Sequence, residues 1–359
     1  MDLIKQKEQR DMIDFGLLLP FRNPKKWERS FADIYAEHID DAVFAETLGY
    51  DTIWTTEHHF AEDGWSPSLL PILAAIASRT KTIRIGTFII VLPFHHPVRV
   101  AEDAATVDII SNGRLDLGLG QGYWLSEFAS FNISRKQRVS RLTEGVEIID
   151  KCFTEESFSH DGKYWQLNDI ELSPRPIQKP GPPIWVAAMA ENSVRRVARL
   201  GYHLAGSGGA DLQQFYDDEL KKVGRKIEDH SVSQLRAVYV AETREKAWDD
   251  CEQHLHYMMS LYDKRYKEAD DMKWGQEVMS APVVPPIGKL RHDRDVSFFQ
   301  APLIVGTPDD AITEIERYLS ETRCTHLCMW MQMAGMPSEK VRSSMSLFAK
   351  EVIPHFRKE

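Results

Sequence analysis

The stretch Thr52-Ile53-Trp54-Thr55-Thr56-Glu57-His58-His59-Phe60 joins a short run of strand-forming residues to a carboxylate and two imidazoles. The run predicts a buried strand that ends just before Glu57. Side chains alternate along an extended chain, so His58 and His59 should point in different directions, and only one can face a given pocket. Histidine exchanges protons near neutral pH, which makes this strand end a candidate for acid–base chemistry. The alternative is a pair of loop histidines that are hydrogen-bonded to their surroundings.

Length and composition limit the possible classes of protein. A chain of 359 residues with 43% hydrophobic and 27% charged residues is typical of a soluble globular protein, either two ordinary domains or one large barrel. The net charge of −10 argues against nucleic acid or an anionic membrane as the main partner. Residues 1–11 are charged, lack the apolar core of a signal peptide and are expected to form a frayed N-terminal arm. No later segment is long and apolar enough to span a bilayer.

The cysteines give no sign of a metal centre. The chain has four, Cys152, Cys251, Cys324 and Cys328, and their spacing with histidines does not match a metal-binding pattern. Cys324 and Cys328 straddle an apolar strand-like stretch, so we predict that these two are buried thiols and not metal ligands. We predict no metal site and a reduced, cytoplasmic setting.

Hydrophobic periodicity alternates between strand-like and helix-like segments along the chain. The predicted strands are the one at Ile53 and residues 13–19, 83–91, 115–119, 184–188, 203–205, 235–241 and 326–331. The predicted helices are residues 31–48, 69–77, 98–110, 139–153, 192–200, 212–223, 243–257, 307–319 and a last one from Lys340. This alternation predicts an α/β fold: a single (β/α)8 TIM barrel with insertions, forming one domain over residues 1–359. An open doubly wound sheet is the alternative, but the turn at residues 20–24 lacks its glycine fingerprint.

Two segments interrupt the alternation. Residues 157–170 carry turn residues between aromatics and predict a hairpin. Residues 256–300 show little periodicity and interrupt the strand–helix unit after the seventh strand. Long loops at that position lie over the active face of a barrel, so we predict an active-site lid; a surface insertion or a dimer arm is the alternative.

Glycine-rich and polar segments follow several predicted strands, at the end where barrel enzymes bind ligands. They include His95 and His96, residues 118–122, 188–193 and 206–209. At residues 190–193 a strand runs straight into a helix, which leaves free backbone N–H groups that suit a phosphate.

Three of these motifs together resemble the bacterial luciferase family. They are residues 49–60, with Glu57-His58-His59-Phe60 at their end; residues 85–99; and Asn112-Gly113-Arg114-Leu115-Asp116-Leu117-Gly118. The resemblance implies a flavin-dependent monooxygenase of the luciferase-like group. Such enzymes use reduced FMN supplied by a separate flavin reductase and oxidise a small organic substrate with molecular oxygen through a flavin hydroperoxide.

The resemblance also implies roles for individual residues. His58 matches the catalytic imidazole, and Phe88-Ile89 matches a dipeptide joined by a non-prolyl cis bond behind the flavin ring. The other matches are Gly120, Gln121 and Gly122 in the loop beside the ring and phosphate, and Met189, Ala190 and Ser193 in the phosphate-binding turn. Gln121 stands where luciferase has an arginine, and Met189-Ala190 replaces a Glu-Ser pair. Phosphate binding must then use backbone N–H groups, Ser193 and a basic group that the sequence does not identify.

Two alternatives on the same fold remain: a deazaflavin-dependent oxidoreductase and a non-catalytic flavin-binding partner subunit. The Glu57-His58-His59 set favours the monooxygenase, since luciferase's non-catalytic subunit lacks the first of the two histidines. Family members pair through their early helices, so we expect a homodimer. Five aromatic residues are candidates either for a substrate pocket or for core packing: Trp54, Trp65, Tyr123, Trp124 and Trp330.

Overall fold

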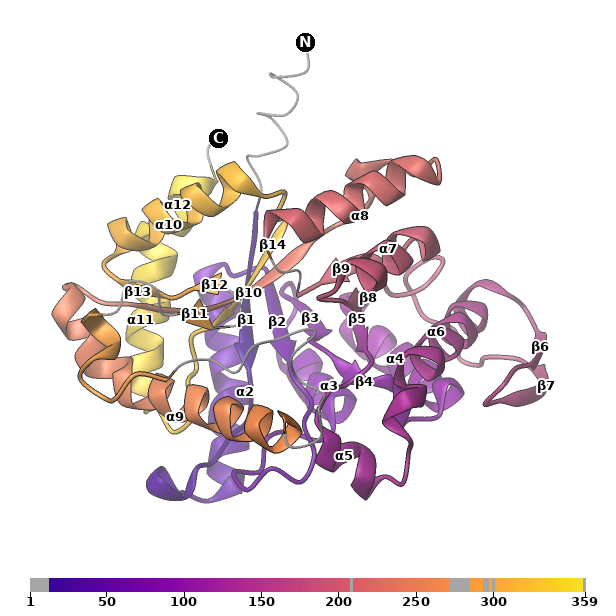
Figure 1. Cartoon of the computed structure of the whole chain (residues 1–359), viewed down its shortest axis with the longest axis horizontal. Helices are drawn as coiled ribbons and strands as arrows, with labels where there is room; N and C mark the ends of the chain where they lie inside the picture. The colour runs from indigo at the N-terminus through magenta and orange to yellow at the C-terminus, as the bar shows by residue number, and fades with distance from the viewer. Residues whose placement is uncertain (1–12, 207–208, 271–283, 293–296, 299–300, 358–359) are drawn as a thin grey trace, which may run out of the picture.

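The computed structural model describes residues 13–206, 209–270, 284–292, 297–298 and 301–357 (Figure 1). The predicted N-terminal arm lies outside the described residues. So do residues 271–283, 293–296 and 299–300 of the predicted lid.

Eight parallel strands form one curled sheet with helices around it (Figure 1). The strands are β1 (Asp14–Leu19), β2 (Thr52–Thr55), β3 (Arg84–Thr87), β5 (Leu115–Gly120), β8 (Ile184–Ala187), β9 (His203–Ala205), β10 (Ser233–Val240) and β14 (His326–Trp330). Hydrogen bonds join them in the order β10-β14-β1-β2-β3-β5-β8-β9. The sheet closes where Leu204 of β9 forms a parallel bridge with Val232, just before β10. This closure confirms the predicted (β/α)8 barrel.

The helices begin and end where local signals favour it. They are α2 (Phe31–Leu48), α3 (Leu69–Arg79), α4 (Pro97–Ser111), α5 (Leu125–Ser130), α6 (Arg138–Thr154), α7 (Glu191–Leu200), α8 (Ala210–Lys222), α9 (Arg244–Asp270), α10 (Pro308–Glu321), α11 (Ser338–Glu351) and α12 (Ile353–Phe356). The Ser30 hydroxyl accepts from the Ala32 N–H at the start of α2, and Gly49 ends that helix with a φ of 80°. At the start of α10, Thr307 and Asp310 form a capping box.

Several predicted boundaries were wrong, and the short elements account for most of them. The predicted strand at residues 83–91 is divided into β3 and β4 (Ile90–Val91), with a cis peptide at Phe88–Ile89 between them. The strand β13 (Ile304–Gly306), which pairs with β10, was not predicted, nor were helices α5 and α12. These elements span too few residues to show a hydrophobic period. The hairpin at residues 157–170 is present as β6 (Phe158–Asp161) and β7 (Gln166–Ile170).

The prediction of an irregular segment from residue 256 was also wrong. Helix α9 does not end at residue 257 but continues to Asp270. Leu255, Met258, Met259 and Tyr262 are all buried, and their spacing of three and four residues continues one apolar face of the helix. The described first part of the predicted lid is therefore a helix that packs against the barrel.

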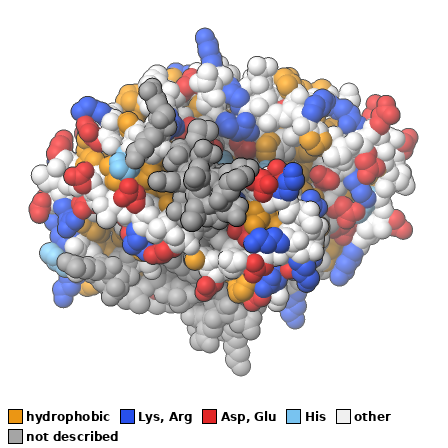
Figure 2. Space-filling model, turned by 90° about the horizontal axis from the view of Figure 1, so that it is seen from above, with side chains coloured by type: hydrophobic (Ala, Val, Ile, Leu, Met, Phe, Trp, Pro, Cys, Tyr) orange, Lys and Arg blue, Asp and Glu red, His pale blue; other side chains and the backbone are white. Residues whose placement is uncertain are grey.

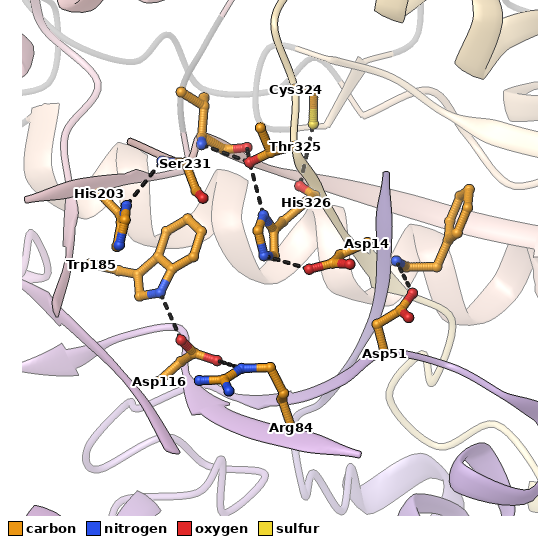
Figure 3. Close-up of polar contacts among 12 residues, drawn as sticks. Asp14, Asp51, Arg84, Asp116, Trp185, His203, Ser231, Cys324, Thr325 and His326 are labelled. Carbon is orange, nitrogen blue, oxygen red and sulfur yellow. Dashed lines mark hydrogen bonds and ion pairs between the residues drawn. The ribbon is translucent and has the colours of Figure 1, made fainter. Parts of the chain in front are cut away.

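Polar side chains fill the barrel interior at the ends where its strands begin (Figure 3). Asp116 accepts hydrogen bonds from Arg84 Nε (2.6 Å) and Trp185 Nε1 (3.2 Å). The Trp185 ring lies 4.8 Å from the ring of His326 across the interior, and His326 pairs with Asp14 at 2.7 Å. Buried polar groups cost free energy unless they are paired, and these contacts pair them.

The surface carries mixed charge. Acidic and basic side chains are interspersed on the face seen in Figure 2 instead of gathering by sign. Within the described residues, no helix combines the length and the apolar composition needed to cross a membrane.

His203, at the start of β9, should make stability depend on pH. Burial lowers its pKa from 6.5 to about 4; nearby Asp116 opposes this, and positive charges on neighbouring side chains add to it. The Ser231 N–H donates to His203 Nδ1 (2.9 Å; Figure 3). Nδ1 therefore acts as an acceptor and cannot carry a proton at the same time. Between pH 6.5 and 4 the unfolded chain binds a proton that the folded chain does not. The contribution of neutral His203 is therefore complete above that window and is lost as the pH falls through it.

We predict that His203→Asn flattens this dependence, because asparagine can still accept from Ser231 but cannot be protonated. The free energy of unfolding should fall less steeply with acid, by up to about 1.4 kcal/mol per pH unit. Urea unfolding at several pH values between neutral and mildly acidic measures the slope. The exposed His96→Asn is the control and should leave the slope unchanged. Equal slopes for wild type and His203→Asn would contradict the prediction.

Candidate active site

The loop after β2 places His58 in a buried polar pair. His58 Nδ1 lies 3.0 Å from Oε1 of Glu127, on α5, and both side chains are buried. The same Glu127 oxygen accepts from the backbone N–H of His59 (2.7 Å). Since a carboxylate only accepts, Nδ1 carries the ring proton and Nε2 is left as an acceptor. Nε2 lies 3.3 Å from the Tyr123 hydroxyl.

Aromatic rings enclose this imidazole. His58 stacks on Trp124, with ring centroids 3.7 Å apart and planes at 16°, and meets the edge of Trp65 at 4.3 Å. Tyr262 of α9 lies 5.9 Å from Trp65. Arg265 of the same helix lies over Trp124 and donates to Ser126 at the start of α5 (3.2 Å). The C-terminal half of α9 thus covers Trp65 and Trp124, the two rings that contact His58. Figure 1 shows the course of α9 across the barrel.

The five candidate aromatic residues divide between the pocket and the core. Trp65, Tyr123 and Trp124 contact His58. Trp54 packs inside the barrel against Trp185, and Trp330 packs against Trp65.

The structure turns His58 and His59 in different directions, as the alternation predicts. His59 packs against Phe131 and Phe94, and its Nε2 lies 2.8 Å from Oε1 of Glu57. His95 Nε2 lies 2.9 Å from the same oxygen. Burial alone would raise the pKa of Glu57, but the hydrogen bonds from both histidines outweigh burial and lower it. Glu57 in turn raises the pKa of His95 against the effect of burial.

The residues matched to the flavin ring do come together. The Phe88–Ile89 peptide is cis, and the Phe88 N–H donates to Thr55 O at the end of β2 (2.6 Å). Gly120, at the end of β5, lies directly against Ile89: a Cβ on Gly120 would stand 2.4 Å from Ile89 Cδ1. A side chain at position 120 would therefore force the Ile89 side chain to move. Gly122 follows with a φ of 70°.

The residues matched to the phosphate turn lie at the start of α7. Met189 and Ala190 are half-buried, and Ala190 occupies the N-cap position without a side-chain cap. Glu191 is exposed and pairs with Arg195 (2.9 Å), so its charge is directed away from the turn. Ser193 lines a hollow together with Gln121, from the loop after β5.

Arg196 was missed by the sequence reasoning. It lines the same hollow as Gln121 and Ser193. Burial and the neighbouring Arg199 lower its pKa, whereas its paired neighbour Arg195 has a raised pKa. No carboxylate in the described part of the chain therefore balances Arg196. Its position three residues after Ser193 places both on one helix face, and that spacing was the available signal.

Glu127 was also missed, since it lies on a short helix distant in sequence from His58. Its second oxygen, Oε2, is buried and has no hydrogen-bond partner among the residues that the structure describes. A buried carboxylate oxygen without a partner is costly, so a ligand or water group is expected to reach it.

Comparison with known proteins agrees with this geometry. The sequence profile described as luciferase-like monooxygenase matches residues 13–326. The chain belongs to the luciferase-like monooxygenase family. Its relatives in this family include named flavin-dependent monooxygenases, and the chain is an enzyme of this flavin-dependent type.

Three of the similar proteins show the range of functions among its relatives. The oxygenase component of the flavin-dependent trigonelline monooxygenase of Acinetobacter baylyi is 27% identical over 339 residues, which cover 90% of each chain. The F420-dependent glucose-6-phosphate dehydrogenase of Amycolatopsis mediterranei is 26% identical, covering 89% of this chain and 94% of the relative. The crystal structure of monooxygenase RslO1 from Streptomyces bottropensis superimposes with a TM-score of 0.79 at 27% identity, covering 96% of this chain and 100% of that one.

We predict that Glu127→Ala destabilises the protein and releases His58. The change leaves the buried His59 N–H and His58 Nδ1–H without an acceptor, which should cost about 1–3 kcal/mol. Urea unfolding measures this loss, and the ring nitrogen chemical shifts of His58 should show a mixture of tautomers.

The matched control is Glu127→Gln, whose side-chain carbonyl can still accept both hydrogen bonds. This variant should keep the Nδ1–H tautomer and most of the stability. Equal losses in both variants would show that the hydrogen bonds do not hold the imidazole.

Proposed function

We propose that the chain is the oxygenase component of a two-component, FMN-dependent monooxygenase. It takes reduced FMN from a separate flavin reductase and oxidises a small organic substrate with molecular oxygen. The observation that carries the proposal is the buried His58–Glu127 pair in the loop after β2. The strand beside β2, β3, leads into the cis Phe88–Ile89 peptide. The trigonelline relative, named as an oxygenase component, supports the two-component arrangement.

The residues at the barrel mouth fit a flavin ring. Phe88 and Ile89 are half-buried, and Ile89 lies in a cradle that a side chain on Gly120 would fill. Oε2 of Glu127 is buried and has no partner among the described residues, so this atom is left for a bound group. Phe88 and Ile89 would support the ring, and Gly120 to Gly122 would border it.

The start of α7 offers groups that suit the flavin phosphate. The uncapped first turn offers backbone N–H groups, and Ser193 adds a hydroxyl. Arg196 supplies a positive charge that no carboxylate balances in the described residues. This charge takes the place of the arginine that luciferase has where this chain has Gln121. Gln121, Met189 and Ala190 would border the phosphate without adding charge.

Reduced FMN, when bound, supplies the two electrons that activate dioxygen, so that one oxygen atom enters the substrate and the other leaves as water. His58 is the group that moves a proton, because Glu127 fixes Nδ1–H and leaves Nε2 to accept a proton and return it. Trp65 and Trp124, covered by α9, exclude water from His58. A lid role is proposed for the described helical part of the segment, residues 256–270, and rests on this cover.

A deazaflavin-dependent oxidoreductase is the second candidate, favoured by the F420-dependent relative. Mixing the protein with reduced FMN, oxygen and a panel of small organic substrates separates the candidates, since only a monooxygenase yields oxygenated product, and a non-catalytic flavin-binding subunit yields none. The proposal includes a homodimer and a cytoplasmic location. Light scattering measures the mass of the protein in solution and so tests the homodimer.

We predict that His58→Ala folds and binds reduced FMN but loses product. Product formation should fall by about 10²- to 10⁴-fold, the usual contribution of a general acid–base group, while oxygen is still consumed as hydrogen peroxide. Parallel assays of product and peroxide measure this uncoupling.

His59→Ala is the comparison, since its ring contacts Glu57 and not Glu127. It should reduce stability more than activity. If His58→Ala keeps near-full turnover and His59→Ala is inactive, the catalytic and structural roles of the two histidines are the reverse of those proposed. If both variants keep full turnover, neither histidine takes part in the mechanism.

We predict that Arg196→Ala weakens FMN binding by about 10- to 100-fold, the loss expected for one hydrogen bond to a charged group. Titration of tryptophan fluorescence with FMN measures the Kd without turnover. Arg199→Ala is the control on the same helix, because Arg199 pairs with Glu219 (2.9 Å). An unchanged Kd in Arg196→Ala would place the phosphate elsewhere.

A further inference from the structure

We propose that Glu57, His59 and His95 form a binding site for a divalent transition metal ion. Three possible ligand atoms converge there: Oε1 of Glu57 and the Nε2 atoms of His59 and His95. Each Nε2 lies within 2.9 Å of the carboxylate oxygen, and all three atoms lie within 4.8 Å of one another. The residues come from two loops, one after β2 and one after β4, which the barrel brings together.

The geometry suits an ion of the Zn²⁺ class. Bonds of about 2.0–2.2 Å to nitrogen and oxygen separate neighbouring ligand atoms by about 3 Å at right angles and slightly more in a tetrahedron. The two distances from the carboxylate oxygen to the Nε2 atoms, 2.8 and 2.9 Å, are already close to that spacing, and the two Nε2 atoms lie within 4.8 Å of each other. Two imidazoles and one carboxylate on one side of an ion are a recurrent donor set for Zn²⁺ and Fe²⁺. A neutral imidazole can place its proton on Nδ1 and leave Nε2 for the metal.

The surroundings leave the site both anchored and accessible. Glu57 is 3% exposed, so its carboxylate is fixed by the fold, whereas the His95 side chain is 32% exposed and opens toward solvent. The His59 ring meets the stacked rings of Phe131 and Phe94 edge to face, which restricts its orientation. An ion would have protein ligands on one side and open positions on the other.

The site is distinct from the proton-moving pair. His58 is directed to Glu127 and Tyr123, and neither of these contacts involves the three ligand atoms. The four cysteines are buried, so they do not compete for the ion. A bound ion would fasten the loop after β2 to the loop after β4 and so hold the backbone on either side of His58. The inference does not rest on the proposed function.

Equilibrium dialysis of the chelator-treated full-length protein against Zn²⁺ alone tests the site, without flavin or substrate. We expect one Zn²⁺ per chain and a melting temperature that rises with Zn²⁺ concentration. His95→Ala and Glu57→Gln should each weaken binding by at least about 100-fold, more than the loss of an outer-sphere contact. His96→Ala, the exposed neighbour outside the cluster, should bind like wild type.

A second measurement needs no variant. Co²⁺ added to the wild-type protein should give visible absorption bands of nitrogen and oxygen coordination, without a thiolate charge-transfer band, and Zn²⁺ should displace them. Failure of the wild type to retain Zn²⁺, or equal retention by folded His95→Ala and His96→Ala, would overturn the proposal. Thiolate bands would overturn it as well.

Discussion

The burial of the consecutive polar residues Glu57 and His58, with the half-buried His59 beside them, is the constraint on which this site depends. A buried polar group must find a partner or cost free energy, and the loop itself cannot supply partners for all three. The fold supplies them from elsewhere: His95 reaches Glu57, and Glu127 reaches both His58 and the His59 N–H. The short helix α5 and the loop after β4 are thereby fixed against the end of β2.

This arrangement gives each of two buried carboxylates, Glu57 and Glu127, its own histidine partners. Glu57 interacts with His59 and His95, while Glu127 orients His58. Glu127 thus holds the His58 imidazole, which contacts the aromatic pocket, in one tautomer, and the same oxygen also accepts from the His59 N–H. The contacts of Glu57 with His59 and His95 join the loop after β2 to the loop after β4. Such a division suits a site that must exclude water while it moves a proton.

The long, strongly periodic elements could be predicted from the sequence. Helix α2 has the predicted bounds because its cap residues and its terminal glycine are local signals. Short elements such as β13 and α5 carry no period and were missed. Helix α9 was ended too early although the sequence carries its apolar face onward at helical spacing through Met258 and Tyr262, so that signal was overlooked. Local pattern is enough where one element repeats it over several turns, and too little elsewhere.

The sequence alone determined the alternation of strands and helices, the polar strand ends and the motifs that match the luciferase-like family. Only the tertiary structure decided which charged groups meet: Glu127 with His58, Glu57 with His95, and Arg196 with the hollow beside Ser193. The reason is physical. Hydrophobic period and capping act within a few residues and are written in local sequence. Side-chain pairing across tens of residues depends on how neighbouring strands align when the barrel closes, and no local pattern encodes that alignment.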